Sequence, residues 1–496
     1  MTIDRNAPPF RRATDDERGP GADRIPRRRG HRSRIGTSRG GCMATIRTPS
    51  PATTAPEVNP PGYSRRRALA VLVMIVFFMI INFGDKAVLG LAAVPIMNEF
   101  RIDRSMFGLI ASSFYLLYSI AGIVVGFVSA RVSSRLLLFS MAMMWTVAQI
   151  PVLLVATVPA LVAGRVLLGA AEGPATPMSM HALYKWFPAH KRGLPSALQI
   201  SGAALGVLIA APVLTWLISD HGWRAAFIAL AVVSGLWGIA WLAIGKDGPF
   251  DRDTRHGHGA AAGPSGAAGN PKIWKILVSG TFLGSAASAF GGHWAMAVNS
   301  AWLPEYLHST MQFGPADVAG VISAISGTSL VLLLTISPLS DLLLRRGLSV
   351  RWAHGALQGV AVTIAGLAMV LVPLADASAI RLVLIVIAFS GSAVAFPLHY
   401  MTAAAVVPPA KRGAVFGILA ATGTLPGLVA PYLTGRIVDG GATVVAGYGT
   451  AFTLAAVVMI ACGVYAIAAI RPAHDARRLT RVGTTGTADD ATAGAV

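Results

Sequence analysis

Long apolar runs separated by short polar loops fill the chain from residue 68 onward. Each run is about twenty residues long, and a helix of that length can cross the hydrocarbon core of a bilayer. The pattern predicts an all-α membrane protein with twelve transmembrane helices. We predict these helices over residues 68–97, 106–128, 135–156, 158–182, 195–218, 224–245, 276–302, 315–339, 351–373, 379–403, 413–435 and 446–470.

One polar segment divides the predicted helices into two groups of six. Residues 247–272 are rich in charged residues, Gly, Ala and Pro, a composition typical of a flexible connection. We therefore predict two six-helix bundles, over residues 66–246 and 273–472, joined by this linker. The remaining segments, residues 1–65 and 473–496, are predicted to be polar tails.

Lys and Arg are distributed unevenly between alternate loops. One set of loops carries only Arg101, Arg104, Arg224, Arg381 and Arg436. The other set carries, among others, Arg131, Arg135, Lys185, Lys191, Lys275, Arg345, Arg346, Arg351, Lys411, Arg412, Arg471, Arg477, Arg478 and Arg481. Loops rich in Lys and Arg remain on the cytoplasmic side of a membrane. We therefore expect both termini to be cytoplasmic, in the inner (cytoplasmic) membrane of a cell.

The positive charge of the chain is concentrated in one tail. Charged residues are only 13% of the 496 residues, whereas a soluble domain usually has about 25%. The net charge of +19 would suit nucleic-acid binding, but fifteen arginines lie within residues 1–67, which are too poor in apolar residues to fold. We interpret this tail as disordered, either as positive flanking of the first helix or as sequence upstream of a start at Met43. No nucleic-acid partner is expected.

The sequence offers few groups for catalysis or for a cofactor. Its two cysteines, Cys42 and Cys462, are far apart and form neither a disulfide framework nor a metal cluster. It contains no GxxxxGK[ST] nucleotide-binding loop and no recognisable nucleophile–base pair. We therefore expect no metal, no cofactor, no ATP-driven step and no enzymatic activity.

The two predicted bundles resemble each other in sequence. The pattern xxPxxKRG occurs as WFPAHKRG at 186–193 and again, 220 residues later, as VVPPAKRG at 406–413. Two further matches follow in the same order: AAP (210–212) with VAP (429–431), and GWRAAF (222–227) with GYGTAF (447–452). A parallel repeat of this kind is typical of transporters whose two halves rock around a central site.

Four ionisable residues interrupt predicted helices of the first bundle: Asp85, Lys86, Arg165 and Glu172. An ionisable group near the bilayer centre costs at least about 2.5 kcal/mol and is functional by default. Arg165 and Glu172 are seven residues apart and share a helix face. Asp85 and Lys86 are adjacent, so they point about 100° apart. We predict that Asp85 pairs with Arg165 while Lys86 faces a cavity; the alternative is a purely structural pair between two helices.

Neutral polar residues replace these charges in the second bundle. Ser390 and His399 are candidate substrate contacts there, and Tyr115, Tyr118 and Gln199 are candidates in the first bundle. The alternative is that they hold helices together, as polar residues in bundles often do. Further neutral polar residues are His293, Asn299, Ser392, Thr422 and Thr424, and Gly173, Pro174 and Pro177 are expected to break the helix after Glu172.

The sequence resembles the major facilitator superfamily over nearly all of residues 66–471. In that family the loop after the second helix reads Gly-x-x-x-Asp-Arg-x-Gly-x-Arg, and here it reads GFVSARVSSR (126–135), with Ala130 in place of the acid. The corresponding loop of the second half, SPLSDLLLRR (337–346), keeps its acid. The resemblance implies that these loops latch the cytoplasmic ends together through Gly126, Arg131, Arg135, Asp341, Arg345 and Arg346. Loss of the acid is expected to shift the balance between inward and outward states.

Within that superfamily the chain resembles the anion:cation symporters, which import sugar acids and other organic anions with protons or sodium. The stretches that carry the resemblance are NFGDKAVL (82–89), RVLLGAAEGPATP (165–177), WFPAHKRG with GWRAAF, and WLPEYL (302–307). The resemblance implies that Asp85 and Glu172 carry protons and that Arg165 pairs with the acids. It also implies that Lys86 receives the substrate carboxylate.

Two departures from that branch lie in the expected substrate site, which also includes Asn82. Lys86 stands where the branch has Arg, and Phe83 stands where it has Tyr. Both changes remove hydrogen-bond donors, and Lys offers a point charge where Arg offers a bidentate fork. We therefore expect a less polar carboxylate than a heavily hydroxylated sugar acid.

The predicted function is import of a small organic anion, a carboxylate or a sugar acid, by proton symport through alternating access. Sodium is the alternative coupling ion, and we expect a monomer in the lipid bilayer. One alternative function is an efflux antiporter or organophosphate exchanger, although phosphate substrates usually require arginines from both halves and the second half has none in its predicted helices. Another is a transporter-like sensor that binds its ligand without moving it, which the degenerate loop at 126–135 would fit.

Overall fold

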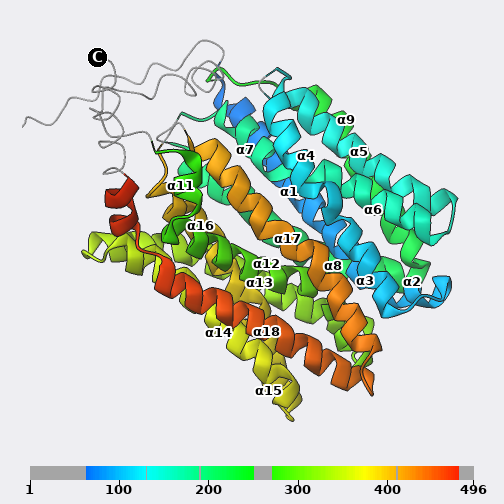
Figure 1. Ribbon diagram of the computed structural model, residues 1–496. Coiled ribbons are helices and arrows are strands. Elements are labelled where there is room, and N and C mark those ends of the chain that lie inside the picture. The colour runs from blue at the N-terminus through cyan, green and yellow to red at the C-terminus, as the bar shows by residue number, and fades with distance from the viewer. Residues whose placement is uncertain (1–62, 130, 189–190, 251–270, 409–410, 480–496) are drawn as a thin grey trace, which may run out of the picture. The chain divides into compact units, whose positions relative to one another are not determined.

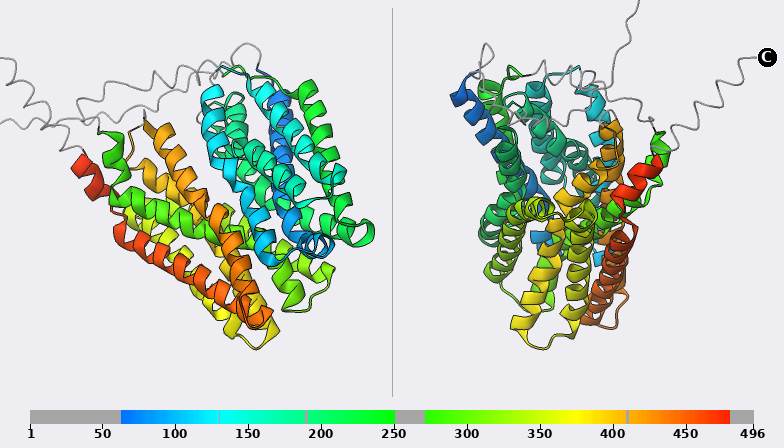
Figure 2. Two further views of the ribbon diagram at one scale, coloured as in Figure 1. Left: turned by 45° about the vertical axis from the view of Figure 1, so that its right-hand side comes forward. Right: turned by 90° about the vertical axis from the view of Figure 1, so that its left-hand side faces the viewer.

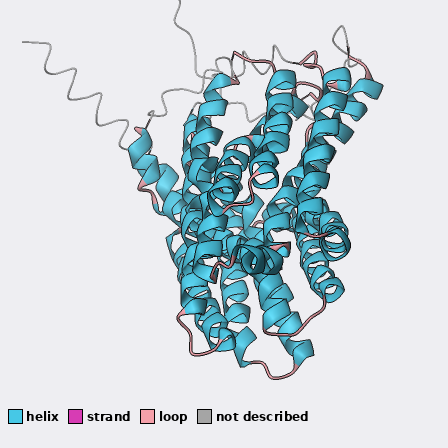
Figure 3. Cartoon of the chain, turned by 90° about the vertical axis from the view of Figure 1, so that its right-hand side faces the viewer, coloured by secondary structure: helices cyan, strands magenta, loops and turns pink. Residues whose placement is uncertain are grey.

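The computed structural model describes residues 63–129, 131–188, 191–250, 271–408 and 411–479. Every regular element in these ranges is a helix, as the sequence predicts (Figure 3). Most of the two predicted tails and of the linker, together with Ala130, Met43 and Cys42, lie outside the described residues.

The N-terminal half, here the described residues up to 250, forms the helices coloured blue to green in Figure 1. Several of them begin at a residue whose side chain accepts a hydrogen bond from the first turn, such as Asp103 before α3, Ser133 before α5 and Thr157 before α6. The helices are α1 (Arg65–Leu91), α2 (Ala93–Phe100), α3 (Arg104–Ser113), α4 (Tyr115–Val128), α5 (Ser134–Leu154), α6 (Val158–Glu172), α7 (Ala175–Tyr184), α8 (Gly193–His221) and α9 (Trp223–Ile244).

The C-terminal half, the described residues from 271 onward, repeats this pattern of long helices. Its α-helices are α11 (Ile273–Leu277), α12 (Gly280–Ser309), α13 (Pro315–Arg345), α14 (Leu357–Leu371), α15 (Ser378–Ser390), α16 (Ala395–Ala404), α17 (Arg412–Asp439) and α18 (Val444–Ala469). Short segments of other helix types extend or interrupt them: the π-helix η2 (Arg351–Ala356) and the 3₁₀-helices η3 (Val372–Leu374) and η4 (Gly391–Val394).

Ten helical segments of the described chain are long and apolar enough to cross a membrane. Each coincides with a predicted span. The two predicted spans that are not among the ten coincide with α6–α7, which is interrupted at Gly173 and Pro174, and with α12, which is rich in Gly, Ala and Ser. The twelve crossings and the cytoplasmic location of the termini therefore remain predictions.

The repeated sequence motif adopts the same local structure in both halves. Lys191 N donates to Pro188 O before α8, and Lys411 N donates to Pro408 O before α17, each over 2.9 Å. In both copies the arginine that follows, Arg192 or Arg412, donates from Nε to a backbone carbonyl five residues earlier, at 2.9 and 3.4 Å. The sequence repeat thus corresponds to a structural repeat of the turn that leads into the fifth helix of each half.

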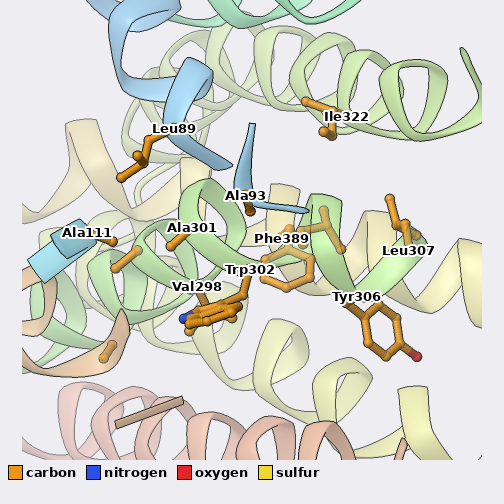
Figure 4. Close-up of a cluster of buried hydrophobic side chains, with 14 of the residues drawn as sticks. Leu89, Ala93, Ala111, Val298, Ala301, Trp302, Tyr306, Leu307, Ile322 and Phe389 are labelled. Atoms are coloured by element: carbon orange, nitrogen blue, oxygen red, sulfur yellow. The ribbon is translucent and has the colours of Figure 1, made fainter. Parts of the chain in front are cut away.

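A large apolar cluster joins the two halves (Figure 4). It includes Leu89 of α1 and Ala111 of α3 from the N-terminal half, and Trp302 of α12 and Ile322 of α13 from the C-terminal half. The backbones come especially close where α1 crosses α12, since a Cβ atom on Gly90 would overlap the carbonyl oxygen of Ser300. Only glycine permits this approach.

Hydrogen bonds also join the halves at one end of the helices, which we call the Arg104 end. Arg104 donates from Nη2 to Glu305 Oε1 of α12 over 2.9 Å, and the Tyr448 hydroxyl donates to the other Glu305 oxygen. Asp439, at the end of α17, accepts from Ser105 N and from Ser105 Oγ at 2.6 and 2.7 Å. These bonds tie the start of α3 to α12 and α17, and Figure 2 shows α17 (orange) alongside helices of the N-terminal half.

An exposed ion pair also lies at the Arg104 end, within the N-terminal half. Arg224 Nη2 lies 2.6 Å from Glu99 Oε1, and Trp223 Nε1 donates to the other oxygen of Glu99 over 2.8 Å. These hydrogen bonds, chiefly those from Arg224, lower the pKa of Glu99 below its ordinary value.

The predicted gating residues lie at the opposite end of the helices, in or just after the last turns of α4 and α13 and at the start of α5. Arg131, Arg135, Asp341, Arg345 and Arg346 are exposed, as is Gly126. Arg135 donates to the carbonyl oxygen of Leu242 in its own half. Within the described ranges none of these side chains bonds to the other half, so the predicted latch is not formed in this structure.

Candidate functional site

The four predicted intramembrane charges come together between α1 and α6. Asp85 and Glu172 are fully buried, and Arg165 is 5% exposed. Lys86 Nζ lies 3.1 Å from Glu172 Oε2 and donates to Asn82 Oδ1 over 2.8 Å. Asn82 and Lys86 are four residues apart in α1, so their side chains share one face of the helix.

Two aromatic rings complete the surroundings of Lys86. Its ammonium nitrogen lies 4.2 Å from the centre of the Phe83 ring and 5.5 Å from that of Tyr118. Tyr118 can lie this close because α4 approaches the break between α6 and α7, where a Cβ atom on Gly173 would overlap the Tyr118 carbonyl oxygen. The ring at position 83 therefore contributes a cation–π contact where a tyrosine hydroxyl would contribute a hydrogen bond.

The predicted ion pair between Asp85 and Arg165 is wrong for this structure. Asp85 Oδ1 accepts a hydrogen bond of 3.0 Å from Gln149 Nε2 of α5, and no Asp85–Arg165 ion pair forms in the described part of the chain. Arg165 instead places its guanidinium carbon 5.0 Å from the centre of the Phe114 ring. The helical twist between Asp85 and Lys86 explains the difference, because it directs Lys86 toward α6 and Asp85 toward α5.

Several polar atoms of this cluster have no hydrogen-bond partner among the described protein atoms. They are Asn82 Nδ2, Asp85 Oδ2, Arg165 Nε, Arg165 Nη1 and both carboxylate oxygens of Glu172, whose contact with Lys86 is an ion pair. Unpartnered buried polar atoms are uncommon and destabilise a fold. Proteins tolerate such destabilising groups mainly at functional sites, so their concentration in one place makes this cluster a candidate site.

Two cavities lie beside this cluster, and Lys86 and Tyr115 line both of them. The larger encloses about 540 Å³ of empty space between the halves. Its lining residues are Phe83, Lys86, Ala87, Leu91, Tyr115 and Val207 of the N-terminal half, and Met296, Asn299, Ser300, Pro304 and Ile322 of the C-terminal half. The smaller, of about 320 Å³, is lined by Lys86, Leu89, Ala111, Phe114, Tyr115, Arg165, Ser300, Ala301 and Pro431. Lys86 therefore faces a cavity, as predicted.

Three other predicted substrate contacts lie away from these cavities. Gln199 donates to Ser179 Oγ over 2.8 Å inside the N-terminal half, which fits the alternative that it holds helices together. Ser390 donates to Val386 O of its own helix over 2.5 Å. His399 is buried with its ring centre 4.3 Å from that of Tyr400. None of the three lines either cavity.

Sequence reasoning missed three residues of the site and its surroundings. Gln149 is a lone polar residue in an apolar run, a weak signal that becomes meaningful only beside Asp85. Asn299 was grouped with the neutral polar residues, and only the structure places it in the cavity lining. Glu305 lies in the quoted stretch WLPEYL, but the helix was predicted to end at residue 302, whereas α12 continues to Ser309 and buries this acid.

The arrangement combines two acids and two bases beside a cavity between the halves. Lys86 can attract an anion in the cavity, while Asp85 and Glu172 can each accept a proton. The described residues contain no cluster of three or more His, Cys, Asp or Glu side chains that could hold a metal ion. These side chains suit anion binding and proton transfer.

Comparison with known proteins finds a transporter family and individual transporters. The family model described as "Major Facilitator Superfamily" matches residues 75–431. The chain is 27% identical over 313 residues to the D-galactonate transporter of Escherichia coli O6:H1, and 28% identical over 326 residues to the probable sulfoacetate transporter SauU of Cupriavidus necator. These matches cover 60% and 63% of this chain, and 72% of each relative. The hexuronate transporter of Escherichia coli K12 is 25% identical over 260 residues, which are 50% of this chain and 59% of that protein.

Solved structures show the same fold. A bacterial homologue of the human lysosomal transporter Spinster matches with a TM-score of 0.61 at 18% identity, over 85% of this chain and 99% of that one. A D-xylose–proton symporter matches with a TM-score of 0.62 at 17% identity, over 79% of this chain and 97% of that one.

Proposed function

Because the chain belongs to the Major Facilitator Superfamily, we propose that it is a secondary transporter that imports a small organic anion, a carboxylate, together with protons. Members of this family are transporters, so the chain is a multi-pass membrane protein and not an enzyme, as predicted. The relatives named for D-galactonate, sulfoacetate and hexuronate support an anionic substrate. We further propose that it acts as a monomer in the cytoplasmic membrane, with both termini in the cytoplasm.

The observation that carries the proposal is the ion pair between Lys86 and Glu172 at the cavity wall. Lys86 is the cationic group that both cavities share, and Glu172 already neutralises it at 3.1 Å. A substrate carboxylate must therefore replace Glu172 as the partner of Lys86. Replacement leaves Glu172 buried and unpaired, an arrangement that costs about 3–5 kcal/mol unless the acid is neutralised.

Protonation of Glu172 removes that cost and releases Lys86 for the substrate. Proton and anion then enter the site together, which is symport. Asp85 is the second proton acceptor, held by Gln149 and carrying one oxygen without a partner. Arg165, within the same buried cluster, supplies a positive charge that favours the ionised form of both acids once the substrate has left.

Alternating access is supported by the contacts between the halves. The cavity lies between them, and the bonds of Arg104 and Asp439 close one end. We assign the Arg104 end to the extracellular side, since its loops carry few Lys and Arg residues. The structure is then a state closed to the outside. The exposed residues at the other end, including Arg131 and Asp341, form the cytoplasmic latch when the halves rock to the opposite state.

The organophosphate exchanger is less well supported. Phosphate recognition usually draws on cations from both halves, whereas the two cations that line the cavities, Lys86 and Arg165, both come from the N-terminal half. The sensor is also less well supported. The degenerate loop would suit it, but a protein that only binds its ligand does not need two buried acids beside the cavity.

The proposal is tested by uptake of labelled acids into proteoliposomes that contain the purified full-length chain. We expect an inwardly directed proton gradient, acidic outside, to drive accumulation of at least one acid from a panel that includes D-galactonate and sulfoacetate. Accumulation driven only by a sodium gradient would show that the coupling ion is sodium and not the proton. Binding without accumulation under either gradient would contradict transport and favour the sensor.

A further inference from the structure

The larger cavity has mostly apolar walls. Phe83, Ala87, Leu91 and Val207 line it from the N-terminal half, and Met296, Pro304 and Ile322 line it from the C-terminal half. Its polar groups are confined to Lys86, Tyr115, Asn299 and Ser300. A ligand that fits these walls must itself be largely apolar, because a hydroxyl group buried against them loses its water without gaining a partner.

Of the two polar residues that the C-terminal half contributes, Asn299 carries a side-chain oxygen with no hydrogen-bond partner among the described protein atoms, whereas the Ser300 hydroxyl is already bonded to its own helix. This Asn299 Oδ1 atom is buried. The neighbouring Ser300 already donates its hydroxyl to Ala297 O over 3.2 Å. Asn299 lies on α12 and Lys86 on α1, and both line the larger cavity. A buried acceptor without a partner is costly, and a ligand that donates a hydrogen bond to it would remove that cost.

We propose that Asn299 is the specificity-determining residue of this transporter, and that its substrate is a carboxylate with an apolar body and one hydroxyl-type hydrogen-bonding group. The inference rests on the proposed function, because it takes Lys86 as the partner of the carboxylate. The carboxylate binds Lys86 beside Tyr115, the body packs on the apolar walls, and the hydroxyl group donates to Asn299 Oδ1. The substrate thereby bridges the N-terminal and C-terminal halves.

This assignment separates the chain from a carrier of polyhydroxylated acids. A sugar acid presents several hydroxyl groups, and the cavity has partners for only one or two of them. Each hydroxyl left unpaired in a buried site lowers affinity roughly tenfold. Conversely, an acid without any hydroxyl group leaves Asn299 unpaired, and sites built to hydrogen bond a substrate discriminate against such analogues.

The test compares the affinities of four acids for the purified full-length chain in nanodiscs, by isothermal titration calorimetry. The probes are benzoate, 3-hydroxybenzoate, 4-hydroxybenzoate and gluconate. We expect at least one hydroxybenzoate isomer to bind about threefold to tenfold more tightly than benzoate, and gluconate to bind most weakly. In Asn299→Leu, which keeps the number and branching of side-chain heavy atoms but removes the acceptor, we expect benzoate affinity to be retained and the advantage of the hydroxyl group to be lost.

Thr335→Val is the matched control, since Thr335 is an exposed residue of α13 that donates only to its own helix. It should leave all four affinities unchanged, and benzoate binding by Asn299→Leu reports that this variant is folded. Gluconate binding more tightly than the hydroxybenzoates, or an equal loss for benzoate and hydroxybenzoate in Asn299→Leu, would overturn the assignment of Asn299. Failure of the proposed anion site is a separate result, in which Lys86→Ala binds all four acids as the wild type does.

Discussion

The Lys86 ammonium, at the wall of a cavity between the halves, lies 3.1 Å from the fully buried carboxylate of Glu172. A base that is already neutralised cannot bind a substrate anion without giving up its partner. Under the proposed mechanism, the pair opens when Glu172 takes up a proton and closes when it is ionised. This relationship determines how the site should respond to substitution.

Replacing Glu172 with Gln should abolish net uptake driven by a proton gradient while sparing exchange of external for internal substrate. The reason is that Gln is permanently neutral, so Lys86 stays free for the anion but no proton accompanies it. Labelled uptake and counterflow in proteoliposomes measure the two activities separately. Glu99→Gln, which alters an exposed acid paired with Arg224, should keep both. Gradient-driven uptake at the wild-type rate in Glu172→Gln would remove Glu172 from the proton pathway.

Replacing Lys86 with Ala should lower the affinity for the transported anion about 10-fold to 100-fold, because a hydrogen bond to a charged group contributes about 1.5–3 kcal/mol. Lys86→Arg keeps the charge and should retain binding. Equilibrium binding of labelled substrate to the purified variants provides the measurement. Lys275→Ala removes a lysine outside the site and serves as the control. If the Lys86→Ala protein binds the anion normally, the substrate carboxylate has another partner.

Replacing Gln149 with Leu should lower the free energy of unfolding by about 1–3 kcal/mol, since Asp85 would remain buried without its hydrogen bond. The loss should be smaller when Asp85 is already Asn, because a neutral amide is less costly to leave unpaired than a carboxylate. Thermal unfolding of the two single variants and the double variant in detergent completes the cycle. Additive losses would mean that the two side chains are not coupled.

Replacing Arg104 with Ala should open the Arg104 end more often, because it removes the bond from α3 to Glu305. The measurement is the rate at which maleimide labels Ser300→Cys, which lines both cavities, in a background without Cys42 and Cys462. We expect labelling from the extracellular side to be about fivefold to tenfold faster, equivalent to about 1–1.4 kcal/mol.

Arg381→Ala is the control for this experiment, because Arg381 bonds only to Ala375 O within its own half. Its labelling rate should equal that of the parent protein. An unchanged rate in Arg104→Ala would show that other contacts at this end, such as those of Asp439, suffice to hold it closed.

Apolar patterning predicts the helices of this fold well, because long apolar runs in a membrane protein have few alternatives to helix. The xxPxxKRG repeat likewise corresponds to two turns with the same backbone hydrogen bond, made by Lys191 and Lys411. Helix ends are less predictable: the acid at Glu305 was placed beyond a helix that in fact continues to Ser309. A polar residue near the end of an apolar run gives no signal of whether the helix has ended.

The candidate site was predictable in membership but not in pairing. Burial of charge in a membrane is so costly that ionisable residues within apolar runs, here Asp85, Lys86, Arg165 and Glu172, can be recognised as site candidates from the sequence. Which acid contacts which base depends on the rotation and packing of the helices. Because successive residues point about 100° apart, Lys86 forms an ion pair with Glu172 while Asp85 accepts a hydrogen bond from Gln149. Spacing along one helix cannot reveal how the facing helix is rotated.

The absence of a side chain at Gly90 suggests a way to hold this protein in one conformation. The close crossing of α1 and α12 exists only while position 90 is bare, and it must come apart whenever the halves separate at that level. A single methyl group introduced there would act as a wedge, favouring the arrangement in which the helices stand apart and excluding the one described here. In the proposed alternating-access cycle, a larger residue at position 90 would therefore shift the protein away from the state described here.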